Sequence, residues 1–237
     1  MLTPGEVHVW YVFSDAVRDA ELLDRYTAMM SPDERARQAR FVFEEDQHQF
    51  LVTRGVLRTL LGKYLSREPT DCDFAVNDYG RPSLTGVDDF DFNVSHTAGL
   101  VAFAFARVPE VGIDVEDVER RRVDPDLPRR FFSASEVAAL EALPEPARVS
   151  RFFDYWTLKE AYIKARGMGL SLPLDGFSMH LDAGAPRITF APSIDDAPAS
   201  WQFAQFHPSP RHRLAVAIRR RGPDLAIRWR ELVPAAP

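Results

Sequence analysis

Hydrophobic and polar positions follow regular spacings along most of the chain, and these spacings predict its secondary structure. Apolar and polar residues alternate over Val7–Phe13, which is typical of a strand. Ser31 and Pro32, with Glu34 three positions after the serine, have the pattern of a capped helix start. A longer helix over residues 45–65 is predicted by an apolar stripe at helical spacing, formed by Phe50, Leu57, Leu61 and Tyr64.

The central and C-terminal parts predict further strands and helices. Residues 79–82 form a turn pattern, and 92–95 and 100–106 read as two strands of a hairpin. A strand over 111–116 and a charged segment over 117–130 precede a helix capped by Ser133 or Ser135. The strongest helical pattern covers 151–166 and stops at Gly167. Four short strands are expected after it, over 177–181, 188–190, 200–206 and 214–218.

This order of elements predicts a mixed α+β protein with two subdomains. Helices flanked by strands occur on both sides of residues 107–110, so we place the boundary there, with one subdomain over 1–108 and the other over 109–237. No residue-level repeat relates the two halves.

Composition narrows the classes of protein that the chain could represent. Of its 237 residues, 46% are hydrophobic and 27% charged, which supports a packed core. The formal charge of −6 argues against a nucleic-acid binder held by its overall field. The longest apolar run, Leu100–Ala106, is far shorter than the roughly 20 residues that span a bilayer, and no secretory signal is apparent. Cys72 is the only cysteine, so we expect a cytoplasmic protein without internal disulfides.

Lysine is scarce in this chain. The 29 basic residues include only three lysines, Lys63, Lys159 and Lys164. Lysine differs from arginine in carrying a compact ammonium that can lose its proton. Two of the three lysines lie within six residues of each other, which draws attention to that helix.

Asp114 and Glu116 lie two residues apart in a predicted strand and therefore share a face. Two adjacent carboxylates repel each other, and a hard divalent cation such as Mg²⁺ would relieve that repulsion. The alternative is an exposed acidic strand face without a ligand.

The predicted helix over 151–166 places Trp156, Glu160 and Lys164 on one face. A surface pair between the glutamate and the lysine is the simplest interpretation. Trp156 on the same face indicates partial burial, and the scarcity of lysine also favours a functional role.

Two further positions are candidates for binding. His96 follows Ser95 at the end of a predicted strand, where it is either a hydrogen-bonded structural histidine or a ligand-binding residue. Arg54 lies within an apolar stripe, so its charge requires either an internal carboxylate or the phosphate of a ligand. Arginines over 120–130 and 219–221 form basic clusters, for which a charged surface is the simplest interpretation.

The order of these motifs resembles the 4′-phosphopantetheinyl transferase superfamily. The resemblance rests on residues 92–96, 111–116 and 156–161, followed by Lys164 and residues 167–170. The turn at 79–82 and the helix start at Ser31, followed by Arg40 and Phe41, resemble the Sfp-type branch. The similarity extends from about residue 10 to 218.

This resemblance implies a fold and a reaction. The family fold has two similar α+β subdomains related by pseudo-twofold symmetry, with coenzyme A in the cleft between them. The reaction moves the phosphopantetheine arm of coenzyme A to a serine of an apo carrier protein and releases adenosine 3′,5′-bisphosphate. Mg²⁺ would be the cofactor, and relatives of this length are usually monomers.

The resemblance also implies roles for individual residues. Asp114, Glu116 and Glu160 match the carboxylates that bind Mg²⁺, which would neutralise charge on the pyrophosphate. Glu160 also matches the proposed general base, and Lys164 a lysine near the phosphates that assists the leaving group. Lys159 belongs to the same motif and is expected to be structural or to have a less direct role.

Contacts with coenzyme A are implied for a second set of positions, and two departures from the family pattern affect them. The expected contacts, besides Asp114 and Lys164, are Arg37, Arg54, Arg81, Ser95 and His96. Glu34 stands where some relatives have a basic residue, and Gln49 with Phe50 replaces a polar pair. Arg54, on the next turn of the same helix, could compensate.

Two other classes of function remain open at this stage. A binding module would hold coenzyme A or a carrier protein without catalysis, although the complete set of acidic residues speaks against it. Nucleic-acid binding would depend on the arginine clusters at 120–122 and 219–221. We expect residues 120–130 instead to dock the acidic surface of a carrier protein, whose pathway the sequence does not specify.

Overall fold

The computed structural model describes residues 2–119, 124–182 and 184–235. The first half contains five strands and three α-helices: β1 (Glu6–Phe13), α1 (Ala20–Met29), α2 (Pro32–Gln38), α3 (Glu44–Leu65), β2 (Phe74–Val76), β3 (Pro82–Leu84), β4 (Asp91–Thr97) and β5 (Leu100–Ala106). The second half continues with β6 (Val111–Asp117), α4 (Leu127–Phe131), α5 (Ala134–Glu141), α6 (Glu145–Arg166), β7 (Phe177–His180), β8 (Arg187–Phe190), β9 (Trp201–Phe206), β10 (His212–Arg219) and β11 (Ala226–Glu231). Short 3-10 turns lie at Ser14–Ala16, Pro69–Asp71, Gly169–Ser171, Leu174–Gly176 and Pro198–Ser200.

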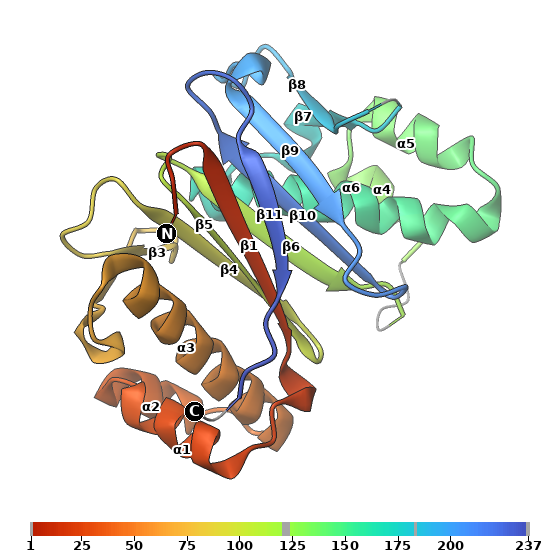
Figure 1. Cartoon of the computed structure of the whole chain (residues 1–237). Helices are drawn as coiled ribbons and strands as arrows, with labels where there is room; N and C mark the ends of the chain where they lie inside the picture. The colour runs from red at the N-terminus through yellow and green to blue at the C-terminus, as the bar shows by residue number, and fades with distance from the viewer. Residues whose placement is uncertain (1, 120–123, 183, 236–237) are drawn as a thin grey trace.

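The two halves repeat one topology, which confirms the predicted α+β fold with two similar subdomains. The order β1-β5-β4 in the first sheet corresponds to β6-β10-β9 in the second. Each half also has a two-stranded ribbon, β2-β3 or β7-β8, and one helix of 22 residues, α3 or α6. Figure 1 shows α1–α3 and α4–α6 gathered on opposite sides of the sheets.

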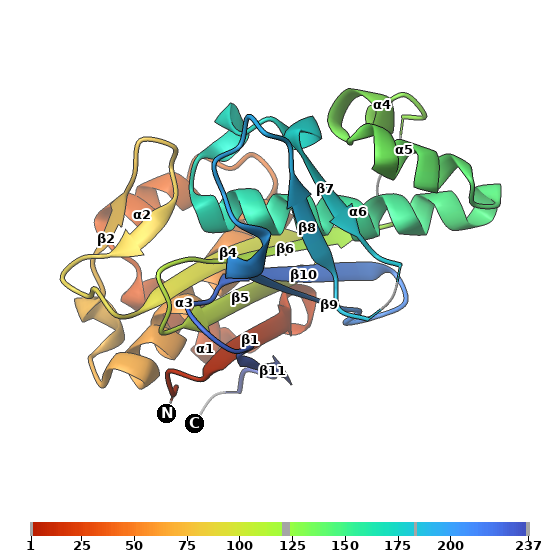
Figure 2. The ribbon, with the colours of Figure 1, turned by 90° about the horizontal axis from the view of Figure 1, so that it is seen from above.

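The sheets pack face to face between the two long helices. One core cluster lies between α3 and the outer face of the first sheet, and a second between α6 and the outer face of the second sheet. A third cluster, of aliphatic side chains from β1, β5, β6 and β10, fills the space between the sheets. This arrangement explains why β5 is buried along its whole length. Figure 2 shows α6 lying over β6 and β10.

Local sequence signals explain most of the element boundaries. Ser31 and Glu34 form the predicted capping box of α2, and Ser133 with Glu136 forms another at the start of α5. The helix α6 ends at Gly167, which adopts a left-handed conformation with φ of 62°. It begins at Glu145, six residues before the predicted start.

The helices α1 and α4 and the strands β2, β3 and β11 were not predicted from the sequence. The helix α1 carries Leu22 and Tyr26 into the core with helical spacing, and Asp19 caps it. The strand β11 returns from the second half and pairs in parallel with β1, at the edge of the first sheet (Figure 1). Its apolar side chains, Ile227 and Trp229, are partly buried against the core between the sheets.

Gly112 allows α6 to lie unusually close to β6. A Cβ atom at this position would overlap the carbonyl oxygen of Ala161 and the backbone nitrogen of Ala165. Since glycine lacks that atom, the helix backbone can approach the strand directly. Glu160 and Lys164 on α6 are thereby brought toward Asp114 on β6.

Candidate active site

The reactive candidates of the second half gather where α6 packs on β6. Asp114 is buried and points toward α6, on the opposite side of the strand from Ile113. Lys164 Nζ lies 2.5 Å from Asp114 Oδ1 and 2.9 Å from Ser95 Oγ. Ser95 Oγ in turn donates to Asp114 Oδ1 at 2.9 Å. The structure therefore joins three of the predicted site residues in one hydrogen-bonded group.

One carboxylate oxygen in this group has no partner. Asp114 Oδ2 is buried and accepts no hydrogen bond from any residue that the structure describes. A buried carboxylate oxygen without a donor is costly, so a cation or another ligand bound to this oxygen would stabilise the site.

Glu160 lies beside this group without joining it. Among the described residues, no hydrogen-bond donor or cation contacts its half-buried carboxylate, so the surface pair with Lys164 does not form. Burial, and then the negative charges of Asp114 and Glu116, raise the pKa of Glu160 from 4.5 to about 7, although Lys164 opposes the shift. A carboxylate with a pKa near neutrality can accept a proton at physiological pH.

The carboxylates of Asp114, Glu116 and Glu160 influence one another without forming a closed cage. In the described part of the chain, no group of three or more His, Cys, Asp or Glu side chains is arranged to hold a metal ion by itself. Mg²⁺ commonly binds to one or two carboxylates and completes its coordination with water and substrate phosphates. The unpartnered Asp114 Oδ2 and the mutual repulsion at Glu160 fit such an open site.

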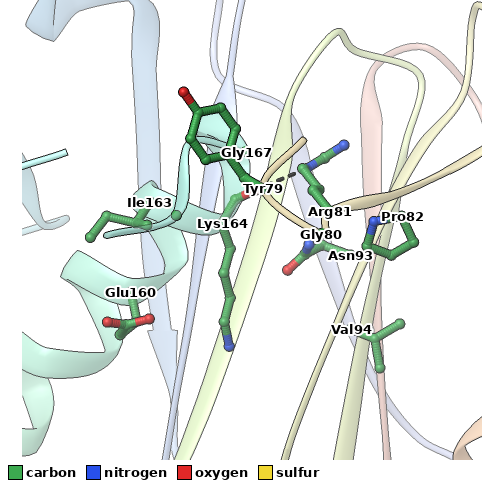
Figure 3. Close-up of a pocket in the computed structure, with 11 residues that line it drawn as sticks. Tyr79, Gly80, Arg81, Pro82, Asn93, Val94, Glu160, Ile163, Lys164 and Gly167 are labelled. Carbon is green, nitrogen blue, oxygen red and sulfur yellow. Dashed lines mark hydrogen bonds between the residues drawn. The ribbon is translucent and has the colours of Figure 1, made fainter. Parts of the chain in front are cut away.

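A cavity of about 310 Å³ adjoins this acidic group and is lined by both halves of the chain. Figure 3 shows Glu160 and Lys164 on one side of it, with Arg81, Asn93 and Val94 on the other. Arg81 donates from Nη2 to Asp91 at 2.6 Å and from Nε to the carbonyl oxygen of Lys164 at 2.9 Å. Its guanidinium thus ties the turn at 79–82 to the end of α6.

A second cavity, of about 330 Å³, shares Pro82 and Val94 with the first. It brings together three predicted contacts from separate elements, namely Arg37, Arg54 and His96. The His96 side chain is exposed at this cavity, and desolvation by the cavity walls, followed by the charge of Lys164, lowers its pKa. The basic residues of the first half thus line a cavity that neighbours the one containing Glu160 and Lys164, with Pro82 and Val94 common to both.

Arg54 has an internal partner. Its guanidinium contacts Glu34, with Nε 2.5 Å from Oε1, and Arg58 Nε lies 3.0 Å from Oε2 of the same carboxylate. Burial would raise the pKa of Glu34, but Arg54 and then Arg58 hold it below its usual value. Of the two predicted alternatives, the structure contains the internal carboxylate, which belongs to Glu34.

Lys159 is structural, as one of the two sequence interpretations held. It is fully buried, lies 2.8 Å from Glu136 Oε2, and donates to the carbonyl oxygens of Leu174 and Phe177. The helical spacing places Lys159 on a different face from Glu160 and Lys164, but only the fold identifies Glu136 as its partner. Lys63 is exposed and has no assigned role.

Other predicted positions have simpler surroundings. Trp156 is half-buried and stacks on Phe152, as its place on the helix indicated. In the second basic cluster, Arg219 pairs with Glu110 and Arg220 with Asp224. Residues 120–122 of the first cluster lie outside the described residues. No helix in the described part of the chain is both long and apolar enough to cross a membrane.

The chain matches two family models over most of its length. Residues 110–218 match the 4′-phosphopantetheinyl transferase superfamily, and residues 19–107 match the N-terminal region of 4′-phosphopantetheinyl transferases. The 4′-phosphopantetheinyl transferase HetI of Nostoc sp. is 35% identical over 92% of this chain and 89% of its own length. The 4′-phosphopantetheinyl transferase Sfp of Bacillus subtilis is 32% identical over 73% of this chain and 76% of its own.

A solved structure with a partial likeness is the holo-(acyl-carrier-protein) synthase of Bacillus anthracis in complex with CoA (3′,5′-ADP). The two chains are 20% identical with a TM-score of 0.39, and the match covers 46% of this chain and 94% of that one.

Proposed function

Since the chain belongs to the 4′-phosphopantetheinyl transferase superfamily, we propose that it transfers the phosphopantetheine arm of coenzyme A to a serine of an apo carrier protein, with Mg²⁺ as cofactor and adenosine 3′,5′-bisphosphate as the second product. The observation that carries this proposal is a pair of neighbouring cavities, one between the two halves and one within the first half, which share Pro82 and Val94. These cavities are lined by Arg37, Arg54 and His96 at one end and by Glu160 and Lys164 at the other, which suits a long ligand with separated phosphates.

The acidic group fits the cofactor. Asp114, Glu116 and Glu160 would hold Mg²⁺, and the unpartnered Asp114 Oδ2 is an oxygen ligand of the kind this ion prefers. When bound, the ion would neutralise negative charge on the pyrophosphate of the substrate. It would also offset the negative charges of Asp114 and Glu116, which add to burial in raising the pKa of Glu160.

The side chains of the site then have separate tasks in the reaction. The Glu160 carboxylate accepts the proton of the carrier serine, directly or through water, while the serine oxygen bonds to the phosphorus on the pantetheine side. The bond between that phosphorus and the bridging oxygen of the pyrophosphate breaks. The Lys164 ammonium, held by Asp114 and Ser95, stabilises the negative charge that collects on the leaving bisphosphate.

The phosphate at the far end of the substrate would lie among the basic residues of the first half. Arg37, Arg54 and His96 line that cavity, and Arg81 lines the other one, next to Pro82, which both cavities share. In this assignment Arg54 exchanges part of its contact with Glu34 for the 3′-phosphate.

We also propose that the enzyme acts as a cytoplasmic monomer.

We place the carrier protein on the second half, near residues 120–130. A groove of about 520 Å³ is lined by residues within 125–129 and by Val137, Leu140, Val149 and Phe152, with Arg129 and Arg148 among its charged residues. Val149 is 44% exposed, so an aspartate there should raise the carrier KM and leave coenzyme A affinity unchanged. Charge reversal at Arg121 and Arg122 should have the same effect, and an unchanged KM in both variants would contradict this placement.

The central test is transfer to a panel of apo carrier proteins from fatty-acid, polyketide and nonribosomal-peptide synthesis. With coenzyme A and Mg²⁺, intact-mass measurement should show the gain of one phosphopantetheine group, and one adenosine 3′,5′-bisphosphate should be released per transfer. A carrier with alanine in place of its serine is the control, and a chelator should stop the reaction until Mg²⁺ is restored. Coenzyme A binding by folded protein without transfer to any carrier would favour the binding module instead.

A further inference from the structure

The strand β6 lies at the edge of its sheet, yet that edge is buried against the first half. In the second sheet, β6 pairs only with β10, so alternate backbone N–H groups of β6 lack a strand partner. The residues concerned, Val111, Ile113 and Val115, are all buried. Buried N–H groups need acceptors, because leaving one unpaired costs about as much as a lost hydrogen bond.

Three side chains of β4 supply these acceptors. The N–H groups of Val111, Ile113 and Val115 donate, respectively, to Asp91 Oδ2 at 2.7 Å, Asn93 Oδ1 at 3.0 Å and Ser95 Oγ at 3.3 Å. All three acceptors are buried. The strands lie side by side in Figures 1 and 2, joined by side chains where a continuous sheet would have backbone hydrogen bonds. We call Asp91, Asn93 and Ser95 the side-chain ladder.

Both ends of the side-chain ladder contact residues of the candidate active site. At one end, Asp91 accepts from Arg81, which also donates to the carbonyl oxygen of Val111. At the other end, Ser95 bonds to Asp114 and Lys164. The middle position, Asn93, lines the first cavity, and its amide oxygen bonds to the backbone of β6.

We propose that Asn93 is a positioning residue that sets the spacing between the phosphate-binding cavity of the first half and the reactive group of the second. The inference rests on the proposed function. A bound coenzyme A touches both halves, so binding energy at its far phosphate promotes reaction only when the halves are held in register. The hydrogen bond from Ile113 to Asn93 is the central link that holds them.

The test compares two substrates, coenzyme A and 3′-dephospho-coenzyme A, in the wild type and in Asn93→Ala. In the wild type, removal of the 3′-phosphate should lower kcat as well as raise KM. In Asn93→Ala, kcat with coenzyme A should fall by about 10- to 100-fold, the effect of a small misplacement of reacting groups. The ratio of kcat between the two substrates should shrink toward one, because the far phosphate no longer aligns the reacting end.

Two further variants separate positioning from a general loss of structure. Asn93→Asp keeps an acceptor oxygen with the same reach and should restore most of kcat. Gln202→Ala is the control, because the Gln202 amide also joins a strand, β9, to the backbone of another segment, at Leu225, and does so away from the site. It should leave the substrate ratio unchanged. Asn93→Leu, which fills the space without an acceptor, replaces Asn93→Ala if the alanine variant does not fold.

The outcomes distinguish this inference from the proposed function. If the wild type transfers phosphopantetheine but the substrate ratio is the same in Asn93→Ala, the positioning role is wrong and the function stands. If folded wild-type protein transfers nothing, the proposed function is wrong, and the positioning role of Asn93 is wrong as well. A lowered kcat with the reduced ratio, rescued by Asn93→Asp, supports the inference.

Discussion

The helices α3 and α6 have equal lengths and equivalent places in the two halves, but they present different chemistry to the space between them. Each contains 22 residues, packs on the outer face of a three-stranded unit and ends at a residue in the left-handed conformation, Ser66 or Gly167. On α3 the buried charges are Arg54 and Arg58, which share the carboxylate of Glu34. On α6 they are Glu160 and Lys164, and Glu160 has no ion-pair partner among the described residues.

This difference indicates a division of work within a duplicated architecture. Paired cations are held in place by their partners, which suits side chains that line a binding cavity. A half-buried carboxylate without a partner has a raised pKa and lacks hydrogen-bond donors or cations, which suits a group that accepts a proton or binds a cation. The fold is shared, whereas the chemistry depends on a few side chains.

The largest effect should come from the unpartnered carboxylate of α6. Glu160→Gln removes the proposed base and a proposed metal ligand, so kcat should fall by about 10²- to 10⁴-fold while coenzyme A still binds. Transfer rates and calorimetric binding measure the two effects. Glu21→Gln, an exposed glutamate of α1, is the control. A wild-type transfer rate in Glu160→Gln would contradict the reactive role that we assign to α6 and not to α3.

The two lysines of α6 should respond in opposite ways to loss of charge. Lys159 is fully buried against Glu136, so Lys159→Met should lower the free energy of unfolding by about 3–5 kcal/mol. The side chain of Lys164 is 30% exposed, so Lys164→Met should cost far less stability but strongly reduce kcat. Urea unfolding and transfer assays of both variants test this prediction. Equal stability losses would show that burial does not separate their roles.

The pairing of Arg54 on α3 can be tested from both partners. If Arg54 also binds substrate phosphate, Arg54→Gln should weaken coenzyme A binding about tenfold, equivalent to roughly 1.4 kcal/mol. Glu34→Gln should strengthen it a few-fold, because it removes the competing carboxylate. Arg25→Gln on α1 provides an exposed control for both variants, with binding measured by calorimetry. An unchanged affinity in Arg54→Gln would leave Arg54 with a structural role alone.

The smallest effect should be a pH dependence of stability in the metal-free protein. The pKa of Glu160 is raised from 4.5 to about 7 in the folded state, mainly by burial. Its contribution to stability is therefore fully present below pH 4.5 and is lost as the pH rises through 7. Between pH 5 and 8, with a chelator present, the wild type should lose about 1–2 kcal/mol relative to Glu160→Gln. Urea midpoints measure this loss, Mg²⁺ should reduce it, and parallel profiles for the two proteins would contradict it.

Much of the local structure could be predicted from sequence because its signals are local. The capping box at Ser31, the hairpin of β4 and β5, and the glycine that ends α6 each depend on residues close together in the chain. The strand β11 has an alternating pattern at Ile227 and Trp229, but it is short and rich in arginine. Its pairing with β1, more than 200 residues away, has no local signal.

For the candidate site, the sequence predicted the reactive residues but not their interaction partners. Its reactive residues could be named from motif resemblance, and the spacing of Asp114 and Glu116, or of Glu160 and Lys164, placed each pair on one face. The partners of those residues could not be found in this way. Glu34 for Arg54, Glu136 for Lys159 and Ser95 for Lys164 are all contacts between different elements.

The sequence by itself determined most of the longer helices and strands, the faces that they bury and the side chains able to carry the chemistry, because periodicity and capping act within a few turns or strands. Only the tertiary structure decided which charges are neutralised and which are left available. That outcome depends on how α6 approaches β6 over Gly112 and how Asn93 holds β6 against β4. Such contacts are set by packing between elements distant in the chain, where a shift of about 1 Å changes a hydrogen bond into an unpaired group.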